Sequence, residues 1–206
     1  MSTTIIFVRH GETAWNLELR YQGQGDSPLS EQGVAQAKRV GDFLSRRKIA
    51  AVYTSDLGRA VFTAETIAQH HGLKPIADQR LREMTFGVWE GLTRAEVLER
   101  YADLYYARLE DSSAHPVPGG EQPEDVVKRL LSCLDDLVHR HDGETIVIVS
   151  HGAALRLTLA ALLGIPLNRS HCLSQNNGGI SELIYSPDNA SCPWRVLTIN
   201  STGHLG

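Results

Sequence analysis

Short runs of apolar and β-branched residues alternate along the chain with longer segments in which apolar positions recur every three or four residues. The runs at about 4–8 (TIIFV), 50–54 (AAVYT) and 145–150 (TIVIVS) are typical of buried strands. Two later runs, ISELIY at 180–185 and WRVLTIN at 194–200, predict a final pair of strands that we expect to form a hairpin. Strands that alternate with helices are typical of an α/β protein.

Segments with helical spacing separate the predicted strands. The first begins after Ser30, a residue type that caps helix N-termini, and a second spans about 57–71. The Thr-x-x-Glu pattern that starts at Thr93 is a capping box and predicts another helix start. A long helix at about 123–141 precedes the strand that ends at Ser150, and one more helix follows that strand. The long helix is expected to bury Val127, Leu130, Leu131, Leu134, Leu137 and Val138.

These elements predict a three-layer α/β/α sandwich around a mainly parallel central sheet. The 206 residues are enough for one full core, so we expect residues 1–206 to form a single domain. A helical segment and a turn-rich stretch at about 90–122 interrupt the alternation, and we expect them to form a helical lid. In such sheets ligands bind beyond the carboxyl ends of the strands, so the residues that follow each strand are the first candidates for a site.

The composition narrows the classes of function. The net charge of -4 and the isoelectric point of about 6.1 provide no basic face for nucleic acid or an anionic membrane. The N-terminal apolar run has no basic flank, and the longest apolar stretch contains Arg156 and is too short to cross a bilayer. Cys133, Cys172 and Cys192 are widely spaced, which is typical of free thiols in a reducing compartment. We therefore expect a cytoplasmic protein.

Two histidines occupy the same local context. His10 follows TIIFVR and precedes Gly11, and His151 follows TIVIVS and precedes Gly152. Each lies at the carboxyl end of a predicted buried strand, so the two imidazoles would face one pocket. A single histidine at a strand end is more often a hydrogen-bonded structural residue, but two in matched contexts favour a functional pair. Gly11 would leave room for a close backbone approach at the turn.

Two arginines are placed to meet an anion. Arg59 falls in the first turn of the helix after the strand at 50–54, where the helix dipole favours negative charge over a cation. It is either a solvated surface arginine or an arginine turned toward a bound anion, and the second explains the position better. Arg9 lies beside His10, and backbone N–H groups at the helix start near Gly152 add further donors. The set predicts a site for a tetrahedral dianion.

No metal or cofactor is expected. The chain has no HExxH pattern, and His139 and His141 are two positions apart and would point to different faces of a helix. The stretch GQGDSP follows no strand and lacks the third glycine of a dinucleotide fingerprint, and no GxxxxGK[ST] loop occurs. The anion would therefore be held by side chains and backbone N–H groups.

Phosphoryl transfer also needs a proton donor for the leaving oxygen. The first candidate is Glu83 in RLREMTFGVWEG, which lies near Met84, Phe86 and Trp89 in the sequence. A carboxyl group among apolar side chains holds its proton more readily. Glu90, further along the same loop, is the competing carboxylate, and spacing alone leaves the choice open.

Four segments together resemble the histidine phosphatase superfamily, also called the phosphoglycerate mutase-like family. They are VRHGETAWN, SDLGRAVFTAETI, LREMTFGVWEG and VSHG, in the family's order and across nearly the whole chain. The resemblance implies that His10 is a nucleophile that becomes a phosphohistidine and that Glu83 is the proton donor. The residues implied to grip the phosphoryl oxygens are Arg9, Arg59 and His151, and those implied to line the same pocket are Asn16, Gln22 and Gly23.

The family contains phosphatases and mutases, and the sequence favours the phosphatase branch. A mutase must retain a bisphosphorylated intermediate, which needs extra cations near the pocket mouth. The expected lid carries Arg94, Arg100 and Arg108 but more acidic residues, so its net charge is negative. The mutase version of the acid loop has a histidine and a tyrosine where this chain has Thr85 and Phe86. A cofactor-dependent phosphoglycerate mutase and a non-catalytic phospho-ligand binding module remain the alternatives.

The natural substrate stays open, from phosphoserine to a broad range of small phosphorylated metabolites. An aromatic pocket wall would come from Phe86, Trp89 and Tyr105 or Tyr106. The tail INSTGHLG resembles that of a subgroup in which a final His-Leu pair folds back near the pocket, which would bring in His204; a frayed C-terminus is the alternative. The last two strands could supply the edge of a homodimer, but their pattern does not require one.

Overall fold

Parallel strands and an antiparallel hairpin share one central sheet. The computed structural model describes residues 1–112 and 114–206, and its strands lie in the order β3-β2-β4-β1-β5-β6. The strands are β1 (Thr3–Arg9), β2 (Ala51–Thr54), β3 (Ile76–Ala77), β4 (Thr145–Ser150), β5 (Ile180–Tyr185) and β6 (Trp194–Ser201). The first four pair in parallel, and β5 and β6 are antiparallel to their neighbours. Ser113, within the expected lid, lies outside the described residues.

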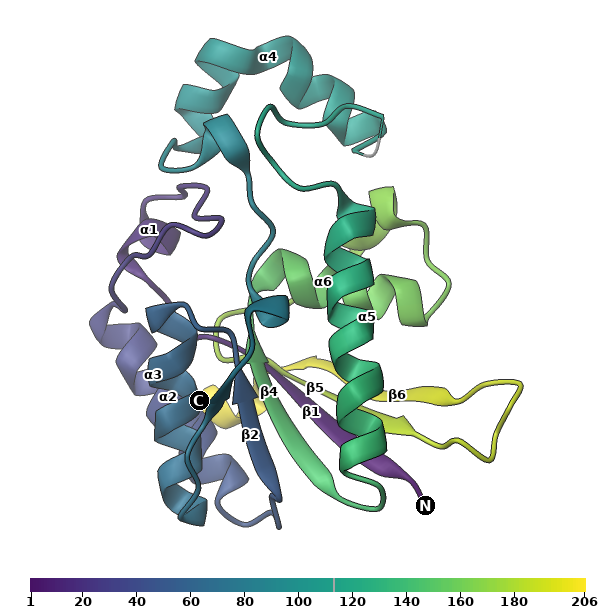
Figure 1. The fold of residues 1–206 in the computed structure, drawn as a ribbon. Helices are drawn as coiled ribbons and strands as arrows, with labels where there is room; N and C mark the ends of the chain where they lie inside the picture. The colour runs from purple at the N-terminus through teal and green to yellow at the C-terminus, as the bar shows by residue number, and fades with distance from the viewer. Residues whose placement is uncertain (113) are drawn as a thin grey trace.

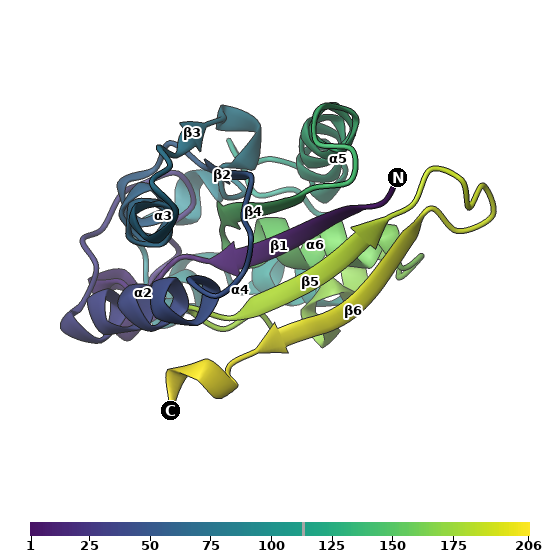
Figure 2. The same ribbon diagram turned by 90° about the horizontal axis from the view of Figure 1, so that it is seen from below.

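Helices cover both faces of the sheet. They are α1 (Ala14–Leu17), α2 (Glu31–Leu44), α3 (Gly58–Ala68), α4 (Arg94–Glu110), α5 (Pro123–Arg140) and α6 (Gly152–Leu162). Helices α2 and α3 pack on one face, and α5 and α6 pack on the other (Figure 2). In β1, Ile5 and Phe7 join the core under α5 and α6, whereas Ile6 and Val8 join the core under α2 and α3, because side chains alternate along a strand. The predicted α/β/α sandwich is therefore confirmed.

The register of β1 against β4 determines where the candidate site forms. Arg9 and Ser150, the last residues of the two strands, are paired with each other. His10 and His151 are the next residues, so both leave the sheet side by side at its carboxyl edge. Strand β2 pairs with the other side of β4 and delivers the start of α3 to the same edge.

The long helix α5 buries a face that is offset from the predicted one. Val126 and Cys133 are buried, whereas Val127 and Leu131 are only partly buried. Apolar residues occur on both sides of the buried face of α5. The spacing of apolar residues in the sequence therefore could not show which of them lie at the centre of that face. The two-residue strand β3 and the four-residue helix α1 were not predicted, because segments this short carry no periodicity.

The described helices are too short or too polar to cross a bilayer. Helix α5 is the longest at 18 residues, but its outer face is polar. Helix α6 is apolar but has 11 residues. None of the helices in the described part of the chain combines the length and the hydropathy that a membrane span needs.

Helix α4 lies beyond the carboxyl edge of the sheet, apart from the sandwich (Figure 1). It begins with the predicted capping box, in which Thr93 accepts from the Glu96 N–H and Glu96 accepts from the Thr93 N–H. Tyr101 has non-helical backbone angles and bends the helix. The segment has a small core of its own, formed by Trp89, Val97, Tyr105 and Val117. Its role as a lid stays a prediction.

The turn after β1 packs directly on the start of α2. A Cβ atom added to Gly11 would overlap the carbonyl oxygen of Gly33, and one added to Gly33 would overlap that of Glu12. This backbone contact confirms the close approach expected at Gly11. It fixes the loop that carries His10 against a helix of the sandwich.

We predict that Gly11→Ala lowers the free energy of unfolding by about 1–3 kcal/mol, because the added methyl group forces the two backbones apart. Chemical denaturation measures the change. Gly203→Ala is the matched control, since a Cβ there would meet nothing within 4 Å, and it should stay within about 0.5 kcal/mol of the parent. Equal stability of the two variants would contradict the assigned contact.

Candidate active site

The two histidines expected to form a pair lie together in a buried position. The ring centroids of His10 and His151 are 5.0 Å apart, with the ring planes at 59°. The exposed fraction is 3% for His10 and 0% for His151. The matched strand registers described above therefore bring both imidazoles into one site, as the sequence predicted.

One hydrogen bond fixes the tautomer of His10. Its Nδ1 lies 2.7 Å from the carbonyl oxygen of Gly11, and a carbonyl can only accept, so Nδ1 carries the proton. Burial lowers the pKa of His10 well below 6.5, and the nearby charges of Arg59 and Arg9 lower it further. The ring is therefore neutral at physiological pH, and its Nε2 keeps a free electron pair.

His151 is buried without a hydrogen-bond partner. Neither ring nitrogen bonds to a described residue. Burial, followed by the charge of Arg59, lowers the pKa of His151 well below its ordinary value. An unpartnered polar group in a buried position costs free energy, so the ring is set to meet a ligand. It precedes α6 directly, where the positive end of the helix dipole favours an anion.

Arg9 and Arg59 bring positive charge into the same place, where Arg59 forms a 3.4 Å ion pair with Asp26 and Arg9 forms none with a described residue. Arg9 donates from Nη1 to the carbonyl oxygen of Gln175, and Arg59 donates from its two Nη atoms to the carbonyl oxygens of Gly25 and Gly23. The Nε atoms of both arginines are buried and unpartnered among the described residues. Burial lowers the pKa of Arg9 to about 10 and also lowers that of Arg59. Partly desolvated guanidinium groups of this kind are strong anion receptors.

Arg9, His10 and Arg59 line a cleft of about 160 Å³ at the carboxyl edge of the sheet. His151, whose ring lies 5.0 Å from that of His10, was predicted to grip the phosphoryl oxygens but is not part of this lining. The lining of the cleft includes these predicted site residues: Arg9, His10, Asn16, Gln22, Gly23, Arg59, Glu83, Phe86 and Gly152. The sequence reasoning missed four others: Arg20, Tyr21, Ala153 and Arg156. A signal existed for Arg156, because it is the one charged residue in an apolar helix and lies one turn after Gly152. Its Nε is buried without a described partner, like those of Arg9 and Arg59.

The structure distinguishes the two candidate carboxylates. Glu83 lines the cleft, and its oxygens accept from the backbone N–H groups of Met84, Ala153 and Ala154. The apolar surroundings expected for this carboxyl group are therefore wrong, since amide donors hold it. Glu90 instead uses Oε1 to accept from the backbone N–H groups of Phe86 and Gln24, and it does not line the cleft.

The helix start that was expected to bind the anion is shared with Glu83. Two N–H groups of the first turn of α6, those of Ala153 and Ala154, are occupied by the Glu83 carboxylate. Gly152 is the remaining residue of that turn that lines the cleft, and its Cα lies against the Arg9 guanidinium. Fewer backbone donors face the anion than the sequence implied, so side chains carry most of the binding.

Asn16 is oriented by its neighbours. Its Oδ1 accepts from the backbone N–H and the hydroxyl of Thr13 and from Nδ2 of Asn177. The amide NH2 end of Asn16 is left for a ligand in the cleft that it lines. Gln22 is held in turn by a 2.7 Å hydrogen bond from its Nε2 to the hydroxyl of Thr13.

The C-terminal tail folds back, but His204 does not line the cleft. Its Nε2 donates to the carbonyl oxygen of Gly178, and its ring stacks on Phe43 of α2 at 5.1 Å. The expectation that His204 binds substrate is therefore not met in this structure. The tail instead packs beside the turn that contains Asn177, which donates to the carbonyl oxygen of His10 and to Asn16.

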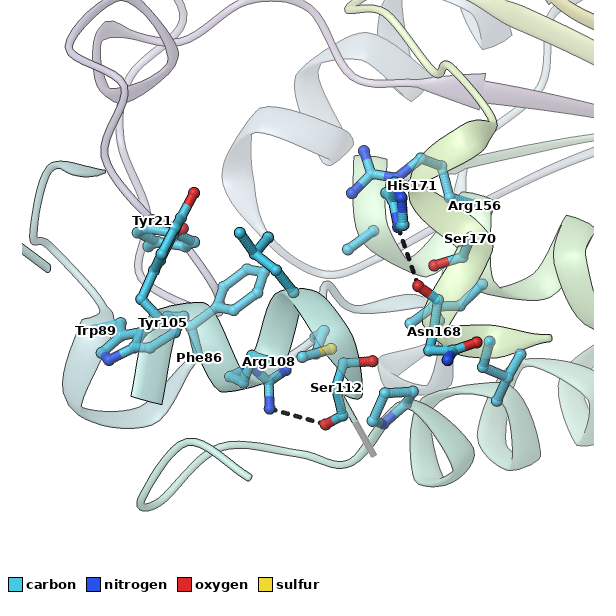
Figure 3. A pocket seen from close by; sticks show the side chains of 16 residues that line it. Tyr21, Phe86, Trp89, Tyr105, Arg108, Ser112, Arg156, Asn168, Ser170 and His171 are labelled. Atoms are coloured by element: carbon cyan, nitrogen blue, oxygen red, sulfur yellow. Dashed lines mark hydrogen bonds between the residues drawn. The ribbon is translucent and has the colours of Figure 1, made fainter. Parts of the chain in front are cut away.

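A second pocket, of about 250 Å³, adjoins the cleft and shares Tyr21, Phe86, Ala153 and Arg156 with it (Figure 3). The predicted aromatic wall is present, since Phe86, Trp89 and Tyr105 line this pocket, whereas Tyr106 is exposed and lies outside the lining.

The net charge of the expected lid does not describe which of its charged side chains face the pocket. On α4, Glu99, Asp103 and Glu110 are exposed, and Arg108 lines the pocket. The argument against a mutase from the acidic lid therefore loses its physical basis.

No group of three or more His, Cys, Asp or Glu side chains suited to a metal ion occurs among residues 1–112 and 114–206. The charges that converge on the cleft are those of arginines. The arrangement provides a neutral imidazole with a free Nε2, a surrounding positive charge and one carboxylate. These groups suit a nucleophilic displacement at an anionic centre.

Comparison with known proteins gives consistent matches over the whole length. A model of the histidine phosphatase superfamily (branch 1) matches residues 5–201. Phosphoserine phosphatase 1 of Hydrogenobacter thermophilus is 35% identical over 98% of this chain and 94% of its own. A probable phosphoglycerate mutase of Yersinia pestis is also 35% identical, with the same coverage. The solved structure of YhfR from Bacillus stearothermophilus superimposes with a TM-score of 0.92 at 33% identity, covering 99% of this chain and 100% of that one.

We predict that His10 is neutral at pH 7.5, with the proton on Nδ1, and becomes charged at a lower pH than a free histidine. Burial and the charges of Arg59 and Arg9 lower its pKa below the ordinary value of 6.5. Long-range ¹H–¹⁵N correlation spectra report both the charge and the tautomer, and the signals missing in His10→Gln assign the ring. A titration midpoint near 6.5, or a proton on Nε2 at pH 7.5, would overturn this assignment.

Proposed function

The chain belongs to branch 1 of the histidine phosphatase superfamily and is a phosphatase, and we propose that it hydrolyses small phosphomonoesters through a phosphohistidine at His10 without a metal ion. The observation that carries the proposal is the hydrogen bond from His10 Nδ1 to the Gly11 carbonyl oxygen. It leaves Nε2 unprotonated inside a cleft lined by four arginines, which are Arg9, Arg20, Arg59 and Arg156.

The phosphoryl group binds first, through the arginines and His151. Their buried donors replace the water that surrounds the phosphate in solution, and they are already oriented before the substrate arrives. Phosphoryl transfer depends mainly on positioning and on stabilisation of charge at the phosphoryl oxygens. The unpartnered Nε atoms of Arg9 and Arg59 are the donors that this step would satisfy.

In the first chemical step, Nε2 of His10 attacks phosphorus and the bond from phosphorus to the ester oxygen breaks. The electron pair of that bond leaves with the ester oxygen, and a proton from Glu83 neutralises it, so an alcohol departs. Glu83 is suited to this role because it lines the cleft with His10. Its Oε1 accepts two backbone N–H groups and its Oε2 only one, so Oε2 is the oxygen that would carry the transferable proton.

In the second step, water attacks the phosphohistidine. The Glu83 carboxylate takes a proton from the water, the bond from phosphorus to Nε2 breaks, and inorganic phosphate leaves. His10 returns to its neutral form with the proton on Nδ1, and Glu83 is again protonated. The two half-reactions balance, and neither needs a co-reactant besides water.

Glu83 also argues against a protein that only binds phosphorylated ligands. Binding of a phosphate does not need a carboxyl group in the cleft, whereas catalysis needs a proton carrier there. The substrate range is proposed to be small phosphorylated metabolites, with phosphoserine as one candidate because a relative is named phosphoserine phosphatase 1.

The segment at 90–122 is proposed to act as a lid over the cleft, within a single domain of residues 1–206.

The location and assembly of the enzyme are also proposals. The cysteines Cys133, Cys172 and Cys192 are unpaired, and the last two are exposed, which favours the reducing conditions of the cytoplasm. Strand β6 forms an edge of the sheet, where a second copy would pair in a homodimer.

We expect His10→Ala to lose about a thousandfold or more of the turnover of phenyl phosphate, because the nucleophile is missing. A chelator should leave the parent enzyme unchanged. His139→Ala, at an exposed histidine of α5, is the control and should keep the parent rate. With 3-phosphoglycerate and its bisphosphate supplied together, the expected product is free phosphate. Undiminished hydrolysis by His10→Ala would refute the mechanism, and rapid formation of 2-phosphoglycerate would identify a mutase.

A second pair of variants tests the proton donor. Glu83→Gln should lower kcat by roughly 10²- to 10⁴-fold, since the amide has no proton to transfer to the leaving oxygen. Glu90→Gln makes the same chemical change at a carboxylate that also accepts backbone N–H groups, and it should lose less than about threefold. Steady-state kinetics measure both. A larger loss in Glu90→Gln than in Glu83→Gln would reverse the assignment.

A further inference from the structure

The second pocket lies where the alcohol part of a substrate must sit. It shares Tyr21, Phe86, Ala153 and Arg156 with the cleft that holds His10. A phosphomonoester bound with its phosphoryl group at His10 therefore extends its remaining part across this shared boundary. With about 250 Å³, the pocket admits one ring with a short substituent. Its chemistry determines which phosphomonoesters fit.

One wall of the pocket is aromatic. The rings of Tyr21 and Phe86 meet edge to face at 5.3 Å, and Trp89 lies 5.3 Å from Tyr21 and 6.2 Å from Tyr105 (Figure 3). Apolar side chains continue the lining at Met84, Leu157 and Leu167. A wall of this kind favours a flat, apolar face on the ligand, because ring edges and faces pack against it.

The charged groups of the pocket are all basic. Among the described residues that line it, they are Arg108 and Arg156, and no Asp or Glu is present. Arg156 and His171 lie on the side of the pocket opposite Tyr21 and Trp89 (Figure 3).

Arg108 is a half-buried cation without a matching anion. Its Nη1 donates to the carbonyl oxygens of Ser112 and His115, which are neutral, and its guanidinium lies 5.7 Å from the centre of the Trp89 ring. No carboxylate among the described residues forms an ion pair with it. Burial lowers the pKa of Arg108. An anionic group on the ligand would supply the missing charge.

We propose that this pocket selects phosphomonoesters whose alcohol part combines a flat apolar face with a second anionic group, and that it disfavours an ammonium group. The inference rests on the proposed function, since it assigns the leaving-group side of that same site. Phosphoserine carries both a carboxylate, which meets this requirement, and an ammonium group, for which the pocket has no carboxylate, so we expect it to be a weaker substrate than an ester with the anionic group alone.

Three aryl phosphates isolate the effect of charge. They are phenyl phosphate, 4-(carboxymethyl)phenyl phosphate and 4-(aminomethyl)phenyl phosphate, in which a methylene group keeps the charge off the ring and the leaving-group acidities similar. At constant ionic strength, we expect kcat/KM to be at least about tenfold higher for the carboxymethyl ester than for the aminomethyl ester, with phenyl phosphate between them. In the same way, 3-phosphoglycerate should exceed phosphoserine, from which it differs by a hydroxyl in place of the ammonium group.

A pair of variants on one helix tests the residue responsible. Arg108→Gln should narrow the ratio of kcat/KM between the carboxymethyl and aminomethyl esters to about threefold or less. Arg100→Gln removes the same charge from an exposed position of α4 and should leave the ratio within about twofold. Arg108→Lys should restore part of the preference. Thermal melting verifies that each variant is folded.

The outcomes separate the two proposals. Failure of the parent enzyme to hydrolyse any of the esters would refute the proposed function. Hydrolysis of all three esters at equal rates, or faster hydrolysis of the aminomethyl ester, would refute the selection for an anionic group while leaving the phosphatase assignment intact. An unchanged ratio in Arg108→Gln would show that Arg108 does not provide the selection.

Discussion

Positive charge buried beside two neutral imidazoles is the constraint on which the site depends. Arg9 and Arg59 have buried guanidinium nitrogens, and they donate hydrogen bonds mainly to backbone carbonyl groups rather than to carboxylates. That environment lowers the pKa of both site histidines, so His10 stays neutral and nucleophilic while the arginines stay charged. Asp26 and Glu83 offset this positive charge only in part, which explains why a dianion is the natural ligand. The fold must hold these cations together in the absence of substrate, and a bound phosphoryl group relieves their repulsion.

The scaffold holds the site through backbone contacts more than through side chains. The pairing of Arg9 with Ser150 brings the two histidines together at the carboxyl edge of the sheet. The close backbone contact between Gly11 and Gly33 holds the loop between β1 and α2 in position. A second support comes from the turn near Asn177, whose side chain donates to the carbonyl oxygen of His10 and to Asn16. The C-terminal tail packs against that turn through His204. The tail is therefore connected to the site through the turn that carries Asn177, which bonds to Asn16.

Much of this arrangement could be predicted from the sequence, because strand ends and helix starts are local features. The contexts of His10, Arg59 and His151 each combine a buried strand with a polar residue at its carboxyl end, and the sheet topology brings them together. Properties that depend on side-chain orientation could not be predicted. The spacing did not reveal that amide donors hold Glu83 or that Arg108, rather than the acidic residues of α4, faces the pocket. The place of His204 depends on packing against Phe43, which no local pattern encodes.

The central claim is that a covalent phosphohistidine forms at Nε2 of His10. Rapid acid-free quenching during turnover of an excess of phenyl phosphate, followed by ³¹P NMR and mass spectrometry of the denatured protein, tests it most directly. The geometry predicts one phosphoryl group per chain, located on the peptide that contains His10, linked through Nε2 and stable to base but labile to acid. Phosphate on another residue, or attachment at Nδ1, would contradict it, as would net inversion at phosphorus with a chiral substrate, because two successive displacements must give retention.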